Sequence, residues 1–294
     1  MRTPWFASLF SLALILSGCD APSPSASAGG GSLYAVDRVF KDPKAQALAI
    51  AAEHGNTAEI QRLMKQEHVN PDVIFSEDDS GMPLVAWPVF TLNPDGLKAM
   101  LDNGANPNAR KPGTHSKHYT DGSGGTYFDH DNAMVWAAKQ EDPLYLKLLL
   151  DHGGDPNTRN GNDETLLFQA FIWHNQWKNV QLLVERGADI NAKSAGSSSL
   201  SNYAFSGQFE RTYWLLQHGA DPTEGQGPPP ASPEPYQYPI IEGIFWGPGN
   251  PDWQRKCQQW LLEHGYRRLP ITPNLRDTRK AFGLPYKDED LPNI

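Results

Sequence analysis

The side chains with the clearest potential for chemistry lie in one polar stretch, residues 111–130. His115 and His118 have the H-x-x-H spacing, and imidazole and carboxylate groups are ordinary zinc ligands. Further groups of these kinds nearby are Asp121, Asp129, His130 and Asp131. Because glycine and serine dominate the stretch and neither a cysteine nor a glutamate-bearing helix completes a ligand set, we favour a solvated polar loop. A metal-dependent hydrolase that uses His115, His118 and His130 is the alternative, which stoichiometric zinc would identify.

Two other features could suggest a nucleophile, and neither has the context that catalysis needs. Residues 121–125 read DGSGG, which shares its residue types with the nucleophile loop of serine proteases but not their order. A turn is the better interpretation. Cys257 is expected on a helix as a small buried hydrophobic side chain, because no activating partner can be identified. We therefore predict no catalytic residue, no metal and no cofactor.

Composition and charge restrict the classes of partner. The chain has 294 residues and a formal net charge of −9. Removal of residues 1–18 takes away Arg2 and no acidic residue, which leaves 24 basic and 34 acidic residues and a charge of −10. An acidic chain without a basic stripe is a poor candidate for binding nucleic acid. With Cys19 and Cys257 as its two cysteines, the chain forms no intramolecular disulfide if Cys19 carries lipid.

The N-terminus has the features of an export signal. Arg2 precedes an apolar run, residues 5–16, that is too short to span a membrane as a helix and is typical of a secretory signal. The run ends in LSGC, which resembles the bacterial lipobox and implies cleavage before Cys19 and a diacylglycerol group on its sulfur. Asp20 resembles the signal for inner-membrane retention in enteric lipoproteins, so we favour the inner membrane, with the outer membrane as the alternative. Residues 19–33 are rich in Pro, Ser, Ala and Gly and predict a flexible tether facing the periplasm.

The elements that must position any functional side chain are indicated by a recurring phrase. It reads LLLDHGGDPNTRN from Leu148, LLVERGADINAK from Leu182 and WLLQHGADPT from Trp214. The leucines end an apolar helical face, glycine supplies the left-handed residue that stops a helix, and the Asp, Pro and Asn that follow favour a turn. The glycines of all five copies are Gly104, Gly153, Gly187, Gly219 and Gly265, at intervals of 49, 34, 32 and 46 residues.

These phrases, with paired alanines, paired leucines and Gly-Ala-Asp, resemble the ankyrin-repeat family, whose period matches the two short intervals. The resemblance implies an all-α solenoid of about five to six helix-turn-helix repeats. The loops that join successive repeats are called fingers. We expect a signal peptide in residues 1–18, the ankyrin domain in residues 34–270 and a tail or cap in residues 271–294. Insertions are expected near residues 111–130 and 224–239, and Pro88 and Pro94 predict shortened helices in the second repeat.

The resemblance also implies where a partner binds. In ankyrin proteins the first helices and the fingers line a concave groove. Alignment of the repeats places on that side Trp136, Gln169, Asn202, Trp173 and Phe205. Side chains that could extend the surface are Arg110, Lys111, His115, His118, Tyr119, Tyr127, Phe128, Arg159 and Lys193. Exposed aromatic and arginine side chains are typical interface anchors. The alternative is that the rings pack against neighbouring repeats.

Taken together, these features predict a lipid-anchored periplasmic module that binds another protein and is a monomer when unbound. The arrangement is similar to that of the immunity lipoproteins encoded beside type VI secretion effectors, particularly phospholipases that act in the periplasm. That similarity implies stoichiometric occlusion of a toxin. An envelope scaffold or assembly factor, similar to periplasmic ankyrin proteins that support redox enzymes, is the alternative of the same class, and the neighbouring genes would separate the two.

Overall fold

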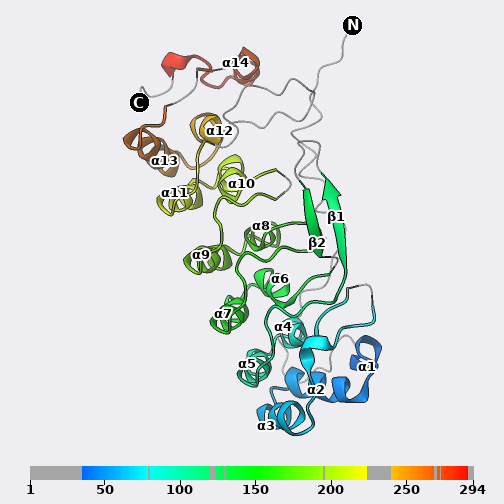
Figure 1. Cartoon of the computed structure of the whole chain (residues 1–294). Helices are drawn as coiled ribbons and strands as arrows, with labels where there is room; N and C mark the ends of the chain where they lie inside the picture. The colour runs from blue at the N-terminus through cyan, green and yellow to red at the C-terminus, as the bar shows by residue number, and fades with distance from the viewer. Residues whose placement is uncertain are drawn as a thin grey trace. The chain divides into compact units, whose positions relative to one another are not determined.

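The structure, a computed structural model, describes residues 35–78, 80–118, 124–128, 130–194, 196–223, 240–267, 270–271 and 273–290. In this part of the chain, six pairs of short helices stack one after another (Figure 1). The first helices of the pairs are α2 (Pro43–Glu53), α4 (Trp87–Phe90), α6 (Ala133–Ala138), α8 (Leu166–Ile172), α10 (Ser199–Phe205) and α12 (Ile240–Trp246). The second helices are α3 (Thr57–Gln61), α5 (Pro94–Asp102), α7 (Leu144–Asp151), α9 (Trp177–Glu185), α11 (Phe209–Gln217) and α13 (Pro251–Glu263). The expected number of repeats is confirmed.

Smaller elements lie before, within and after the stack. Helix α1 (Val36–Val39) precedes the first pair, and α14 (Pro273–Ala281) follows the last one. A π-helical turn, Arg62–Gln66, extends α3, and 3-10 turns are formed by Pro71–Val73, Leu84–Ala86 and Asp288–Asp290. In the described residues, no helix has the length and apolar character needed to cross a bilayer.

Polar side chains fix where the first helices begin. Asn132, Thr165 and Ser198 each precede a first helix and accept a hydrogen bond from the backbone N–H three residues later, at 3.1 to 3.3 Å. Such caps satisfy backbone donors that have no partner within the helix. The first helix of the second repeat is the short one, because Pro88 lies at its second position. The prediction of a shortened helix is therefore confirmed at Pro88 but wrong at Pro94, which begins the nine-residue helix α5, because proline is tolerated at the first position of a helix.

The ends of the second helices depend on left-handed residues. Gly104, Gly153, Gly187, Gly219 and Gly265 all have positive φ, between 86° and 97°, as the recurring phrase predicts. In the first repeat His68 occupies the equivalent place with φ 56°. Each helix therefore stops at the same point of its repeat, and the chain turns into the next finger.

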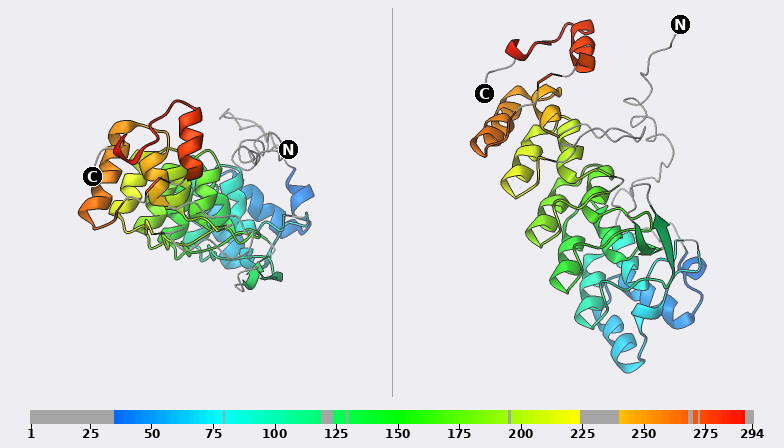
Figure 2. Two further views of the ribbon diagram at one scale, coloured as in Figure 1. Left: turned by 90° about the horizontal axis from the view of Figure 1, so that it is seen from above. Right: turned by 45° about the horizontal axis from the view of Figure 1, so that its top comes forward.

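The core is a continuous apolar layer between the two rows of helices that Figures 1 and 2 show. Alanines of the first helices allow close packing, and a glycine on α5 allows the closest approach: a Cβ at Gly96 would collide with the backbone carbonyl of Ala52. The largest fully buried side chain is Trp87, whose ring meets Phe40 edge-on at 5.6 Å. Each repeat thus buries its apolar face against its neighbours, as a solenoid requires.

Asparagine side chains link successive fingers. Asn157 accepts a hydrogen bond from the backbone N–H of Asp189 at 2.7 Å and donates one to the carbonyl of Gly187 at 3.3 Å. Asn108 makes the same two bonds to the third repeat, and Asn191 makes them to the fifth. We call this series the asparagine ladder. In each step the asparagine side chain bonds to two backbone groups of the next finger, the carbonyl of the helix-ending glycine and the N–H two residues after it.

The ladder begins and ends where the sequence changes. In the first repeat Asp72 stands at the asparagine position and accepts the N–H of Asn106 at 2.8 Å. In the fifth repeat the position is Thr223, whose hydroxyl bonds instead to Asp221 of its own finger at 2.7 Å. The long interval between Gly104 and Gly153 does not interrupt the ladder, because the insertion lies beyond the bonds of Asn108.

The insertion itself differs from the expected polar loop. Strands β1 (Thr114–His118) and β2 (Gly124–Phe128) form an antiparallel hairpin in which Thr114 pairs with Phe128 and His118 with Gly124. The irregular loop predicted from composition is therefore wrong. Glycine and serine do not prevent interstrand hydrogen bonds, and these bonds form the hairpin. The fold class is unchanged, because the hairpin is an addition to one finger. The second expected insertion, residues 224–239, lies outside the described residues.

We expect Asn157→Ala to lower the free energy of unfolding by about 1–3 kcal/mol, because it removes two inter-repeat hydrogen bonds and leaves their backbone partners without them. Chemical denaturation followed by far-UV circular dichroism measures the change. Asn202→Ala is the matched control, since no hydrogen bond of the Asn202 side chain is present among the described residues. Equal stability of the two variants would contradict a stabilising role for the ladder.

Candidate functional site

Trp136 and Trp173 are joined by a lysine. The Nζ of Lys139 lies 5.5 Å from the ring centroid of Trp136 and 5.4 Å from that of Trp173, so one cation links the third and fourth repeats. Lys139 also forms an ion pair with Asp131 at 3.1 Å. Trp136 packs edge-on against Phe90 of the second repeat at 5.9 Å. Trp136 is therefore mainly a packing residue, half-buried between neighbours.

Trp173 and Phe205 are the most accessible of the predicted residues whose side chains are described. Their exposed fractions are 42% and 44%, and both lie at the C-terminal ends of first helices in adjacent repeats. Phe205 leans over α12, because a Cβ added to Gly243 would collide with its ring. Ile172 is also exposed, and nothing within the described residues buries any of these three side chains completely.

Gln169 and Asn202, aligned with Trp136 in the sequence, have different environments. Gln169 is 1% exposed and donates a hydrogen bond to the carboxylate of Glu164 at 2.7 Å. Its side chain is therefore not accessible for direct contact with a partner in this structure. Asn202 is half-buried on α10. The alignment placed the residues at equivalent helical positions, but the depth of each position depends on the neighbouring finger.

Two finger arginines bond to the backbone of the chain. Arg110 donates to the carbonyl of Arg159 at 2.8 Å, and Arg159 donates to the carbonyls of Asp163 and Lys193 at 2.7 and 2.9 Å. Burial lowers the pKa of the Arg110 guanidinium from its ordinary value. These arginines repeat one link from finger to finger, parallel to the asparagine ladder. Much of their hydrogen-bonding capacity is therefore structural.

The hairpin residues can be placed only by their backbone. His115 and His118 lie on β1, and Tyr127 and Phe128 lie on β2. Their side chains lie outside the described part of the chain, as do Tyr119 and Cys19 altogether. The prediction of no metal at His115 and His118, and the alternative of a zinc site there, therefore both stay as the sequence left them. Among the side chains that are described, no group of three or more His, Cys, Asp or Glu could hold a metal ion.

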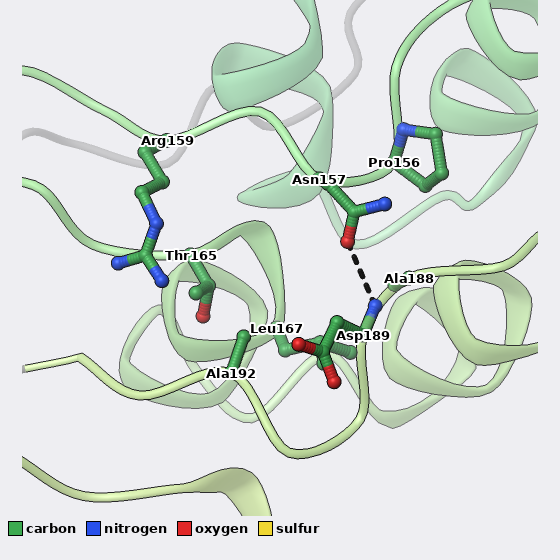
Figure 3. A pocket seen from close by; sticks show the side chains of 8 residues that line it. All are labelled: Pro156, Asn157, Arg159, Thr165, Leu167, Ala188, Asp189 and Ala192. Carbon is green, nitrogen blue, oxygen red and sulfur yellow. Dashed lines mark hydrogen bonds between the residues drawn. The ribbon is translucent and has the colours of Figure 1, made fainter.

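A pocket of about 200 Å³ lies between the third and fourth fingers (Figure 3). Its lining residues are Pro156, Asn157, Arg159, Thr165, Leu167, Ala188, Asp189 and Ala192. The guanidinium of Arg159 borders one side, and the hydrogen bond from the Asp189 N–H to Asn157 borders another. A His or Cys nucleophile or base is not among the lining residues. The pocket is large enough for one side chain of a partner but has no set of groups for catalysis.

Cys257 is buried on α13, as the sequence predicts. Its Sγ contacts the carbonyl oxygen of Phe209 at 3.2 Å, and burial raises its pKa to about 12. A thiol with such a pKa is protonated at neutral pH and is a poor nucleophile. Cys257 therefore contributes to packing between the fifth and sixth repeats.

Sequence reasoning missed three basic residues of the third, fourth and fifth repeats, which are Lys139, Lys178 and Arg211. Lys139 follows Trp136 by three residues on one helix, a spacing that brings side chains together and could have indicated the contact. Lys178 and Arg211 had no such signal. Arg211 lies 5.4 Å from the ring centroid of Trp177, a contact between repeats that depends on their stacking.

Comparisons with known proteins agree with this geometry. Residues 134–226 match the family model for ankyrin repeats in three copies. Among solved structures, the chain resembles the ankyrin repeat domain of Bcl-3, a member of the IkappaB protein family, with a TM-score of 0.53 and 23% identity over 75% of this chain and 86% of that one. It also resembles an ankyrin repeat domain from Acinetobacter baumannii AYE, with a TM-score of 0.54 and 18% identity over 75% of this chain and 98% of that one.

A further similar structure is the ankyrin repeat protein EF0377, with a TM-score of 0.50 and 19% identity over 80% of this chain and the whole of that one. No curated protein matches the sequence. The fold is an ankyrin-repeat solenoid, and residues 134–226 carry recognisable ankyrin repeats. Ankyrin repeats generally bind other proteins, and the fold is typically a non-enzymatic scaffold for interaction.

We expect the thiol of Cys257 to be unreactive in the folded protein, because burial keeps it protonated and shielded. A colourimetric disulfide reagent at pH 8 should modify Cys19→Ser protein only after denaturant is added; Cys257 is the remaining cysteine of that variant. Rapid modification under native conditions would show instead that the sixth repeat opens readily or that the thiol is activated.

Proposed function

We propose that this protein is a lipid-anchored periplasmic module that binds and sequesters a secreted toxin, such as a type VI secretion phospholipase. The observation that carries the proposal is the accessible aromatic pair, Trp173 and Phe205, on adjacent repeats of a scaffold that ordinarily binds proteins. The signal sequence and the lipobox ending in Cys19 support an envelope location. The similarity to immunity lipoproteins in domain arrangement supports the choice of partner.

The proposed mechanism is stoichiometric occlusion. The asparagine ladder fixes the repeats relative to one another, so little conformational entropy is lost when a partner binds the preformed surface. Large aromatic side chains on such a surface supply contact area with few rotatable bonds. A toxin bound in this way loses access to its substrate without any covalent change.

The partner test uses the lipase-type effector expected from a neighbouring gene. Co-expression of this protein should protect cells that export the effector to the periplasm. Replacement of Trp173 and Phe205 together by alanine should weaken binding by at least about 30-fold, as for the loss of one or more interface hot spots. Growth assays and calorimetric titration measure the two effects.

Phe282→Ala serves as the matched control, since Phe282 is the most exposed aromatic side chain in the described residues and lies beyond the repeats. It should leave both protection and affinity unchanged. Absence of any protection by the unaltered protein would reject the immunity role. Protection that survives loss of both Trp173 and Phe205 would reject this surface as the contact.

The anchor is tested by Cys19→Ser. Without the thiol no diacylglycerol can be attached, so the protein should leave the membrane fraction and lose incorporation of labelled palmitate. Cell fractionation and metabolic labelling measure these changes. A variant that stays in the membrane fraction as the unaltered protein does would show that Cys19 is not the anchor.

A further inference from the structure

Exposed apolar side chains gather where the two helices of a repeat are joined. Each first helix runs from a finger to this inter-helix turn, so the turns of successive repeats form a second edge of the stack. Five of the nine most exposed large hydrophobic side chains in the described residues lie in or beside these turns: Leu92, Leu144, Ile172, Trp173 and Phe205. The apolar surface is therefore concentrated on the turn edge, away from the fingers.

The turn of the fourth repeat has an unusual backbone. His174 and Asn175, two consecutive residues, have φ values of 55° and 56°, whereas the first and fifth repeats have a single left-handed glycine in this turn, Gly55 and Gly207, and the second repeat has Leu92 with φ 58°. Side chains make this conformation costly, so it persists only where surrounding contacts fix it. Those contacts come from the next repeat: Asn175 accepts the hydroxyl of Tyr203 at 2.9 Å and donates to a side chain of the following turn.

Two contacts hold Trp173 directly before this turn. The ring lies 5.4 Å from Nζ of Lys139, whose position is fixed by the ion pair with Asp131. Trp173 also caps α8, with its N–H bonded to the carbonyl of Gln169. A tryptophan that is 42% exposed thus has a ring contact with the preceding repeat and a backbone hydrogen bond to the end of α8. This is the arrangement expected of a preorganised interface anchor.

Two basic side chains, Lys178 and Arg211, lie on the helices that follow the turns of Trp173 and Phe205, although the chain carries a net charge of −9. Lys178 is exposed, and neither it nor Arg211 forms an ion pair with a carboxylate among the described residues. Arg211 instead donates to Gln208 and lies over the rings of Trp177 and Tyr203. Within residues 172–178 and 205–211 the acidic side chain is Glu210. The turn patch, which we define as Ile172, Trp173, His174, Lys178, Phe205 and Arg211, is therefore apolar with a basic rim.

We propose that the turn patch binds an acidic segment of a partner protein that inserts an apolar side chain beside Trp173. The inference rests on the proposed protein-binding function and specifies its surface and its partner's chemistry. A folded partner protein can place its carboxylates opposite Lys178 and Arg211 and keep them away from the acidic side chains of this edge. An anionic membrane would also present negative charge to Glu141, Asp142 and Glu210 on the same edge, which would repel it. The charge pattern thus favours a protein over a lipid surface.

The test is selection of a displayed library of random short peptides on the full chain with Cys19→Ser. Enriched peptides should combine Asp or Glu with one large apolar residue. Their affinity, measured by fluorescence anisotropy, should fall at least about tenfold on Trp173→Ala and on the double change Lys178→Glu with Arg211→Glu. Added salt should weaken binding. Phe282→Ala and Lys65→Glu, an exposed lysine of the first repeat, are matched controls that should have no effect.

Lys139→Met separates positioning from general destabilisation. It should weaken peptide binding while thermal unfolding and the far-UV spectrum show that the repeats remain folded. If a variant of Trp173 or Lys139 unfolds, Trp173→Phe takes its place and should bind peptide with intermediate affinity. Enrichment of basic peptides, or of none, would overturn the proposal. If peptide binding were unaffected by Trp173→Ala but abolished by Arg159→Ala, the turn patch would be rejected as the binding surface. The proposed protein-binding function would then stand, with the fingers as its surface. Equal, Trp173-dependent binding to phosphatidylglycerol vesicles would assign the patch to a membrane.

Discussion

The bond on which the rest of the structure depends is the one that each asparagine makes to the finger after it. Asn157 satisfies both a donor and an acceptor of the next backbone, and Asn108 and Asn191 repeat the arrangement. Because these bonds involve backbone atoms beside the helix-ending glycines, they set the position of each finger and of the helix that ends there. Fixed fingers place the first helices in register, and the first helices place the inter-helix turns. A local polar contact therefore contributes, together with the apolar core between the helices, to the position of a surface at the opposite edge.

The two edges of the stack have different properties. On the finger edge, Arg110 and Arg159 bond to neighbouring backbone, and much of their capacity contributes to cohesion. On the turn edge, Trp173 and Phe205 are only half covered, and Lys178 and Arg211 have no carboxylate partner in the described part of the chain. Because these turn-edge side chains remain partly exposed even though they also contact neighbouring repeats, we propose that recognition takes place on the turn edge. Sequence reasoning had assigned Trp173 and Phe205 to a concave groove that the fingers and the insertion could extend.

The features that the sequence predicted correctly are those that depend on local chemistry within one repeat. Gly153 stops a helix and Cys257 is buried, because each outcome follows from a residue type at a given place in the repeat. The hairpin was missed, since strand pairing in residues 114–128 joins segments that composition alone assigns to a loop. The burial of Gln169 and the bridge from Lys139 to Trp173 were also missed. Both depend on how far one repeat is displaced from the next, which no single repeat encodes.

Hydrogen–deuterium exchange of the full chain, with and without its protein partner, tests the central claim most directly. If the turn patch is the contact, amides of residues 172–178 and 205–211 should exchange more slowly in the complex, while the finger around Asn157 should change little. Slower exchange confined to the fingers and the hairpin would contradict the account, because it would place recognition on the edge that the asparagine ladder occupies.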